Sequence, residues 1–173
     1  MTKYVAFLRG INVGGRVIKM ADLAACCEKA GLNQVKTVLQ TGNVVFESDK
    51  SEAELKRLLE DTLTSTFDYP AKVQVLSIPE LQKIIDEYPF GEPKPNIHDY
   101  LIFIENELEQ LLLAEKYELA LGEKVAAGKG VIYWRVEKGL TLKSSFAKVL
   151  TKAKYKPFNT NRNLNTLKKI AAF

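Results

Sequence analysis

The chain has few of the residues on which metal sites, disulfide frameworks and membrane spans depend. Of its 173 residues only two are cysteines, Cys26 and Cys27, and only one, His98, is histidine. Neighbouring residues of a helix point in different directions, so the two cysteines are not expected to form a disulfide with each other. These residues are also too few for an ordinary zinc site, and we expect no metal and no cofactor.

Long apolar runs are missing as well. No stretch approaches the roughly 20 apolar residues that a membrane helix needs. The apolar part of the first nine residues is too short for a signal peptide and has no small-residue cleavage site after it. We therefore expect a cytoplasmic protein that has no membrane partner.

Charge is unevenly distributed along the chain. Residues 1–123 contain 13 basic and 20 acidic residues, whereas residues 124–173 contain 12 basic residues and one acidic residue, Glu137. An asymmetry of this kind favours an anionic partner for the basic region. The alternative is that the two regions neutralise each other across the fold.

The first half of the chain alternates strand and helix patterns. Strand patterns are found at Lys3–Leu8, Val35–Leu39, Val44–Phe46 and Lys72–Leu76. A helix is predicted over Ala21–Ala30, and a second helix follows a capping box at Ser51-Glu52-Ala53-Glu54. The order is β-α-β-β-α-β, which is the ferredoxin-like arrangement.

A proline-rich segment then interrupts the pattern. Residues 89–96 include Pro89, Pro93 and Pro95, so we expect a linker between a first half, 1–88, and a second half, 97–173. Strands are predicted at Tyr100–Ile104, Lys124–Ala127 and Val131–Val136, with helices over Glu107–Leu121 and after Ser144 or Ser145, and no last strand is evident. The predicted fold class is α+β, with two packed ferredoxin-like halves whose antiparallel sheets carry helices on one face.

Two polar segments of the first half are predicted to converge. In a βαββαβ sheet the first and third strands are central antiparallel neighbours, so the end of the first lies beside the start of the third. Glycines let the backbone approach a ligand closely, and arginine and amide side chains hold oxyanions. The candidate ligand-binding residues here are Arg9, Gly10, Asn12, Gly14, Gly15, Gln40 and Asn43. The alternative is that the glycines only serve a tight strand-to-helix connection.

A third polar segment precedes the last predicted helix, which would present Leu164, Leu167, Ile170 and Ala171 on one face. Its candidate ligand-binding residues are Arg162, Asn163, Asn165 and Thr166, which would present donors at a helix start. The alternative is that Asn161 or Asn163 only caps the helix. His98 is expected in a loop, where a histidine is more often incidental than catalytic, and no catalytic carboxylate pair is evident. Lys129–Trp134 faintly resembles an RNA-binding strand, although a buried strand accounts for it better.

Three motifs resemble the signatures of a bacterial family of conserved small proteins, a domain of unknown function. We name them the first signature (Leu8–Gly15), the second signature (Gln40–Phe46) and the third signature (Thr160–Thr166). They agree with the family in order and spacing, although Thr41 and Asn161 stand where serine and threonine are usual. The resemblance implies two ferredoxin-like halves and brings no established reaction, cofactor or catalytic residue.

These observations lead to one main hypothesis and two alternatives. The main hypothesis is the binding of an anionic, phosphate-bearing ligand, either a small molecule or nucleic acid, at a pocket that both ends of the chain share. The first alternative is an enzyme that acts on a small phosphorylated or carboxylated substrate through electrostatic positioning. The second is a structural or interaction module in which the polar segments tie the two halves together.

Overall fold

A computed structural model describes residues 1–10, 17–38 and 42–173 of the chain. It divides into two compact units. The first contains Met1–Gln82 together with Ile170–Phe173, and the second contains Lys83–Lys169. Among the described residues, no helix combines the length and the apolar character that crossing a bilayer requires.

The first unit is built on a four-stranded antiparallel sheet. Its elements are β1 (Thr2–Arg9), α1 (Met20–Lys29), β2 (Asn33–Val38), β3 (Asn43–Ser48), α2 (Glu52–Phe67) and β4 (Lys72–Ser77), followed by α3 (Ile78–Asp86). The strand order is β2-β3-β1-β4, with β1 antiparallel to both β3 and β4. This is the order that the β-α-β-β-α-β pattern predicts.

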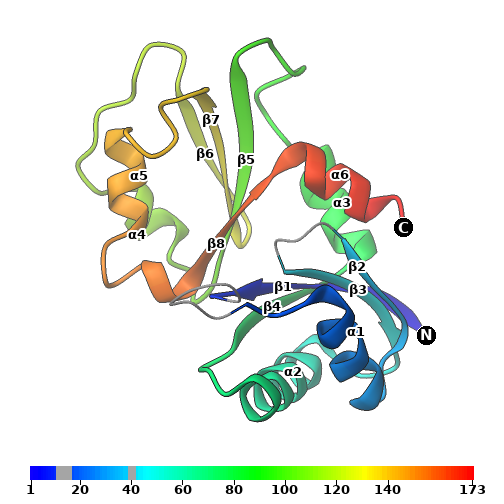
Figure 1. Cartoon of the computed structure of the whole chain (residues 1–173). Coiled ribbons are helices and arrows are strands. Elements are labelled where there is room, and N and C mark those ends of the chain that lie inside the picture. Colours follow the sequence, from blue (N-terminus) through cyan, green and yellow to red (C-terminus); the bar gives the residue numbers. More distant parts are fainter. Residues whose placement is uncertain (11–16, 39–41) are drawn as a thin grey trace. The chain divides into compact units, whose positions relative to one another are not determined.

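Helices α1 and α2 cover one face of this sheet (Figure 1). Alternate side chains of β1, namely Tyr4, Ala6 and Leu8, are buried in one core with the apolar stripes of both helices. The predicted capping box of α2 is confirmed, since Glu54 N donates to Ser51 Oγ at 3.2 Å and Ser51 N donates to Glu54 Oε2 at 2.8 Å. The hydrophobic period and the cap therefore place α2 over the sheet.

The second unit repeats the arrangement. Its elements are β5 (Ile97–Ile104), α4 (Glu109–Leu113), β6 (Lys124–Gly128), β7 (Val131–Glu137), α5 (Ser145–Leu150), η1 (Lys156–Phe158), β8 (Asn159–Asn163) and α6 (Leu164–Ala171). The strand order is β6-β7-β5-β8, and all pairs are antiparallel. The α+β class and the two β-α-β-β-α-β orders, consistent with two ferredoxin-like halves, are confirmed.

One face of the second sheet packs against α4 and α5. Ile102 and Ile104 of β5 share a core with Trp134 of β7 and with Phe146, whose ring centroid lies 5.4 Å from that of Trp134. Ser144 is the cap of α5, because its Oγ accepts from Ala147 N at 2.9 Å. Helices α1 and α2 thus cover one face of the first sheet, and α4 and α5 cover one face of the second.

The structure corrects the sequence-based prediction at the last strand. The second half does have one, β8, and it consists of the polar residues Asn159–Asn163. Asparagine is rare in strands and this segment has no apolar alternation, so the pattern does not predict a strand. β8 is an edge strand that pairs only with β5 in the described sheet.

The predicted helix over Glu107–Leu121 is also wrong for most of its length. Only Glu109–Leu113 is helical. Asn106 and Glu107 have φ angles of 61° and 55°, in the left-handed region, so a helix does not begin at Glu107. Beyond α4 the chain is not helical, and the backbone N–H of Glu118 donates to the side-chain Oγ of Ser145 at 3.1 Å. The leucines of this segment therefore do not form a buried helical stripe.

Candidate functional site

The first signature begins at the end of β1. Arg9 is the last residue of the strand and is half-buried, and Gly10 follows it with a φ of +65°, in the left-handed region that glycine adopts readily. The strand register places Arg9 directly opposite Lys72 of β4. Residues opposite each other project from the same face, so two cations are neighbours at this edge of the sheet.

The second signature adjoins the first, as the strand order predicts. Leu8 N donates to Gly42 O at 2.8 Å, and Phe7 is opposite Asn43. Asn43 is fully buried, and its Nδ2 donates to Val38 O at 3.1 Å. This amide therefore supports the connection between β2 and β3.

Four predicted ligand-binding residues lie outside the described residues. They are Asn12, Gly14 and Gly15 of the first signature and Gln40 of the second. The described part of this edge thus consists of Arg9, Gly10, Gly42 and Asn43.

The third signature lies in the second unit, on β8 and the start of α6. Arg162 is 7% exposed, and its Nε donates to Thr160 Oγ1 at 3.2 Å. Asn159, just before the signature, donates from Nδ2 to Tyr155 O at 2.9 Å and to Leu150 O at 3.2 Å. This part of the strand is therefore tied to the end of α5 through side chains.

The remaining residues of the third signature surround the first turn of α6. Asn163 directly precedes the helix, and its Oδ1 accepts from Asn165 N at 2.9 Å, as in a helix cap. The Asn165 side chain is exposed and Thr166 is half-buried. Asn163 therefore caps the helix, while Asn165 and Thr166 stand where the helix dipole is positive.

The two signature arginines occupy equivalent faces of their own sheets. Side chains alternate between the two faces along a strand, so Arg9 lies on the same face as Val5 and Phe7. The β1 side chains that contact α1 and α2 lie on the other face. Arg162 is opposite Leu101, whereas Ile102 and Ile104 of the same strand face the helices. Each unit therefore carries a signature arginine on the sheet face opposite to α1 and α2 or to α4 and α5, and Phe7 and Leu101 on these faces are fully buried.

Comparison with known proteins identifies the family. A family model described as "Protein of unknown function (DUF1697)" matches residues 1–133. The chain belongs to this family. A solved structure titled as that of the conserved bacterial protein SP0830 from Streptococcus pneumoniae is similar to it, with a TM-score of 0.81 and 28% identity over 99% of this chain and 97% of the other. No curated protein matches the sequence.

In this DUF1697 protein three aromatic side chains of the basic region are internal. Tyr133, Trp134 and Tyr155 are buried, and the Trp134 Nε1 donates to Glu123 Oε2 at 2.8 Å. Buried rings cannot stack on bases, so the resemblance of Lys129–Trp134 to an RNA-binding strand has no support at these positions. The buried-strand interpretation is confirmed.

The histidine is also placed differently from the prediction. His98 lies in β5, opposite Val136, and not in a loop. Its ring is half-buried, with its centroid 5.5 Å from that of Tyr100. A period-2 pattern is weak at the start of β5, where His98 and Asp99 precede the apolar run, and the sequence reading therefore starts the strand too late.

The structure reveals a buried polar cluster that the motifs do not indicate. Arg135 Nε donates to Asp99 Oδ1 at 2.7 Å and Arg135 Nη2 donates to Asp99 Oδ2 at 3.2 Å, while Tyr88 Oη donates to Asp99 Oδ1. Burial and the Asp99 carboxylate raise the pKa of Tyr88 well above its ordinary value. The sequence does contain one indication of this cluster: Arg135 lies inside the apolar run Val131–Val136, and a buried arginine requires a partner of opposite charge.

A pair of carboxyl groups lies at the starts of two helices in the first unit. Ser77 N donates to Glu52 Oε1 at 3.3 Å. Burial, followed by the hydrogen bond and the charge of Glu80, raises the pKa of Glu52 to about 7. Carboxylates are favoured at helix starts, so the pair is explained by the first turns of α2 and α3 without a catalytic role.

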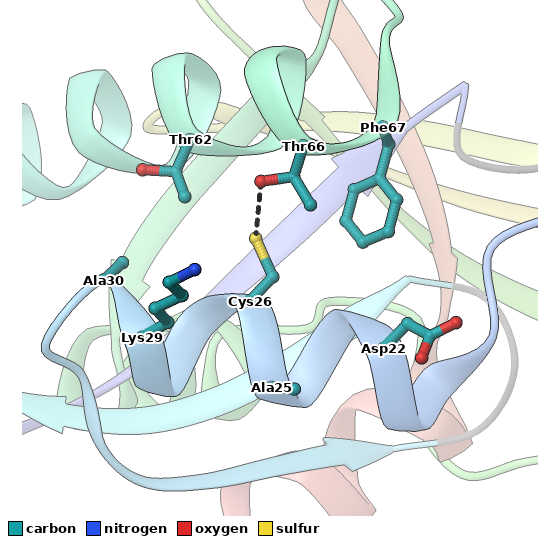
Figure 2. Close-up of a pocket in the computed structure, with 8 residues that line it drawn as sticks. All are labelled: Asp22, Ala25, Cys26, Lys29, Ala30, Thr62, Thr66 and Phe67. Atoms are coloured by element: carbon teal, nitrogen blue, oxygen red, sulfur yellow. Dashed lines mark hydrogen bonds between the residues drawn. The ribbon is translucent and has the colours of Figure 1, made fainter.

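A groove of about 600 Å³ lies between α1 and α2 (Figure 2). Cys26 points from α1 toward Thr66 of α2, with 3.5 Å between Sγ and Oγ1, and Phe67 lies near one end of the groove with Asp22 (Figure 2). Neighbouring Cys27 is buried, which raises the pKa of its thiol to about 12. Both cysteines are free thiols, as predicted. The described residues contain no group of three metal-ligating side chains.

Proposed function

We propose that this protein of the cytoplasm binds an anionic, phosphate-bearing ligand through its three signatures. Arg9 and Arg162 neutralise the anion, and the glycine loop and the start of α6 supply backbone N–H donors. Asn12, Gly14, Gly15 and Gln40 complete the first and second signatures from the segments outside the described residues.

The observation that carries the proposal is the cross-strand pair of Arg9 and Lys72. Two cations directly opposite each other give this edge of the sheet a positive charge that attracts an anion. Gly10 follows at once with a positive φ, and no heavy atom of the described residues lies within 4 Å of the position that a Cβ would take. The backbone at this edge therefore leaves room for a ligand next to two cations.

The third signature supports the same chemistry. Helix starts favour anions because their first N–H groups have no partner within the helix, and α6 has no acidic residue in its first turn. Asn165 and Thr166 lie in that turn, and Arg162 precedes it. These residues place donors and one guanidinium within a span of five residues.

The test is calorimetric titration with inorganic phosphate and pyrophosphate. A charge-assisted hydrogen bond contributes about 1.5–3 kcal/mol, so Arg9→Ala should weaken binding about tenfold or more. The matched control is Arg57→Ala, because Arg57 is exposed on α2, on the other side of the same sheet. Equal affinity of R9A and wild type would refute the role of Arg9.

The burial of Arg162 favours a second candidate, the interaction module. A buried guanidinium bonded to Thr160 Oγ1 is suited to a structural role. Arg162→Ala separates the two candidates, because a ligand-binding Arg162 lowers anion affinity while a purely structural one lowers the unfolding free energy alone. A nucleic-acid ligand is recognised by its salt dependence, since binding to a polyanion weakens steeply with rising salt.

A further inference from the structure

The most exposed large apolar side chains of the described chain lie at one end of the second sheet. β5 begins at Ile97, opposite Glu137 at the end of β7, and β6 begins at Lys124, opposite Arg135. Three loops, 91–96, 119–123 and 138–143, therefore project from the same end of this sheet (Figure 1). Leu121 is 101% exposed and Leu142 is 89% exposed. We call this region the loop end.

Loop 91–96 is held by the buried cluster around Arg135. Arg135 Nη2 donates to Glu92 O at 2.9 Å and to Gly91 O at 3.3 Å. The guanidinium is itself fixed by Asp99, and these two side chains are only 3% and 8% exposed. Burying an ion pair has a large desolvation cost. The fold nevertheless contains the pair, and the pair fixes the position of the exposed loop 91–96.

The other two loops are held in the same manner. The buried Glu123 carboxylate accepts from Trp134 Nε1 at 2.8 Å and from Ala120 N at 2.9 Å, which fixes the turn that carries Leu121. Tyr100 Oη and Thr141 Oγ1 are 3.3 Å apart, and Lys138 N donates to Asn96 O at 2.9 Å. The two leucines are therefore presented on preorganised loops, and preorganisation lowers the entropic cost of binding.

Lysines surround the leucines at the loop end. In these loops and the residues that directly adjoin them, Lys94, Lys124, Lys138 and Lys143 are exposed, and the exposed acidic residues are Glu92, Glu118 and Glu137. Asp99 and Glu123 also belong to this end, but both are buried and bonded to Arg135 and Trp134. The exposed balance is therefore basic, and it flanks two apolar side chains.

We propose that the loop end docks on the interface of an anionic phospholipid bilayer. Leu121 and Leu142 insert below the headgroups, and the lysines are attracted to the anionic lipids, which together provide the two signals that stable interfacial binding needs. Such docking requires no spanning helix, and it departs from the expectation, drawn from the sequence, of no membrane partner. A bilayer accepts leucines on separate loops without a shaped pocket, whereas nucleic acid takes up apolar side chains only as wedges between base steps or against thymine methyl groups.

The test is flotation of the full chain with vesicles of phosphatidylcholine alone and with 30% phosphatidylglycerol. Binding to the anionic vesicles should exceed binding to the neutral ones about tenfold or more, since each lysine near the surface contributes about fivefold. The variant L121S/L142S should lose at least about tenfold in the lipid partition coefficient. The variant K138Q/K143Q should bind neutral and anionic vesicles with a much smaller difference.

Two matched controls make the result specific. Leu111→Ser changes a leucine that is 54% exposed on α4, and K129Q/K156Q changes two exposed lysines, one in the β6–β7 turn and one in η1. Neither control should alter vesicle binding. The proposal is overturned if wild type does not float, if L121S/L142S floats as wild type does, or if K138Q/K143Q loses binding to duplex DNA but not to vesicles. R9A should float normally, so failure of the signature site leaves this test intact.

Discussion

Removal of the Asp99 carboxylate should destabilise the second unit strongly. Asp99→Ala leaves the guanidinium of Arg135, which is 3% exposed, without its counter-ion and with only the carbonyls of Gly91 and Glu92 as acceptors. Breaking a buried pair by removing one partner costs about 3–5 kcal/mol, because an uncompensated charge stays buried. Tyr88 loses its acceptor in the same variant, so we expect a loss at the upper end of this range.

The assay is urea unfolding followed by the fluorescence of Trp134, the single tryptophan, which is buried in the second unit. The midpoint should fall while the slope of the transition stays unchanged. The double variant D99L/R135M removes both charges and should lose less than D99A, since replacing a buried pair by apolar residues is often close to neutral. A loss below about 1 kcal/mol in D99A would refute the assignment of a desolvated ion pair.

Three further predictions address the first unit. Ser51→Ala removes one bond of the capping box of α2 and should lower the unfolding free energy by about 1 kcal/mol in urea titrations, whereas Ser65→Ala on the same helix should have little effect. In the folded state the pKa of Glu52 is raised from 4.5 to about 7, so the folded state binds this proton more tightly than the unfolded state does. The stability that protonated Glu52 contributes is therefore present at low pH and is lost as pH rises through 7. Glu52→Gln should therefore gain stability over wild type between pH 5 and pH 8, by less than about 1 kcal/mol because the group is partly exposed, and an unchanged difference across this range would contradict it. Cys27, whose thiol has a pKa of about 12, should react with a thiol reagent at pH 8 only after denaturation, and rapid labelling of the native chain would contradict its burial.

Regular elements with a clear period are predictable from this sequence. The stripes of α1 and α2, the Ser51 cap and the β6–β7 hairpin follow from local patterns, and the strand order then places the first two signatures side by side. The strand β8 is not predictable in this way, because its asparagines and arginine are held by pairing with β5. Tertiary pairing overrides the local preference there.

The candidate site is predictable only in part. The sequence places Arg9 and Gly10 at the end of a strand, and the structure has them there. The sequence does not reveal that the side chains of Asn43 and Asn163 form hydrogen bonds with nearby backbone groups. In a sequence, an asparagine that bonds the local backbone cannot be distinguished from one that faces a ligand. The Asp99–Arg135 pair is missed for a related reason, since the two residues are 36 positions apart and meet only through the β5–β7 register.

A phosphate titration monitored by the amide resonances of the uniformly labelled protein tests the central claim most directly. If the signatures bind an anion, the amides of Gly10 and Asn165 should each shift with pyrophosphate and reach saturation. The absence of a saturable shift at both amides would contradict anion binding by the signatures.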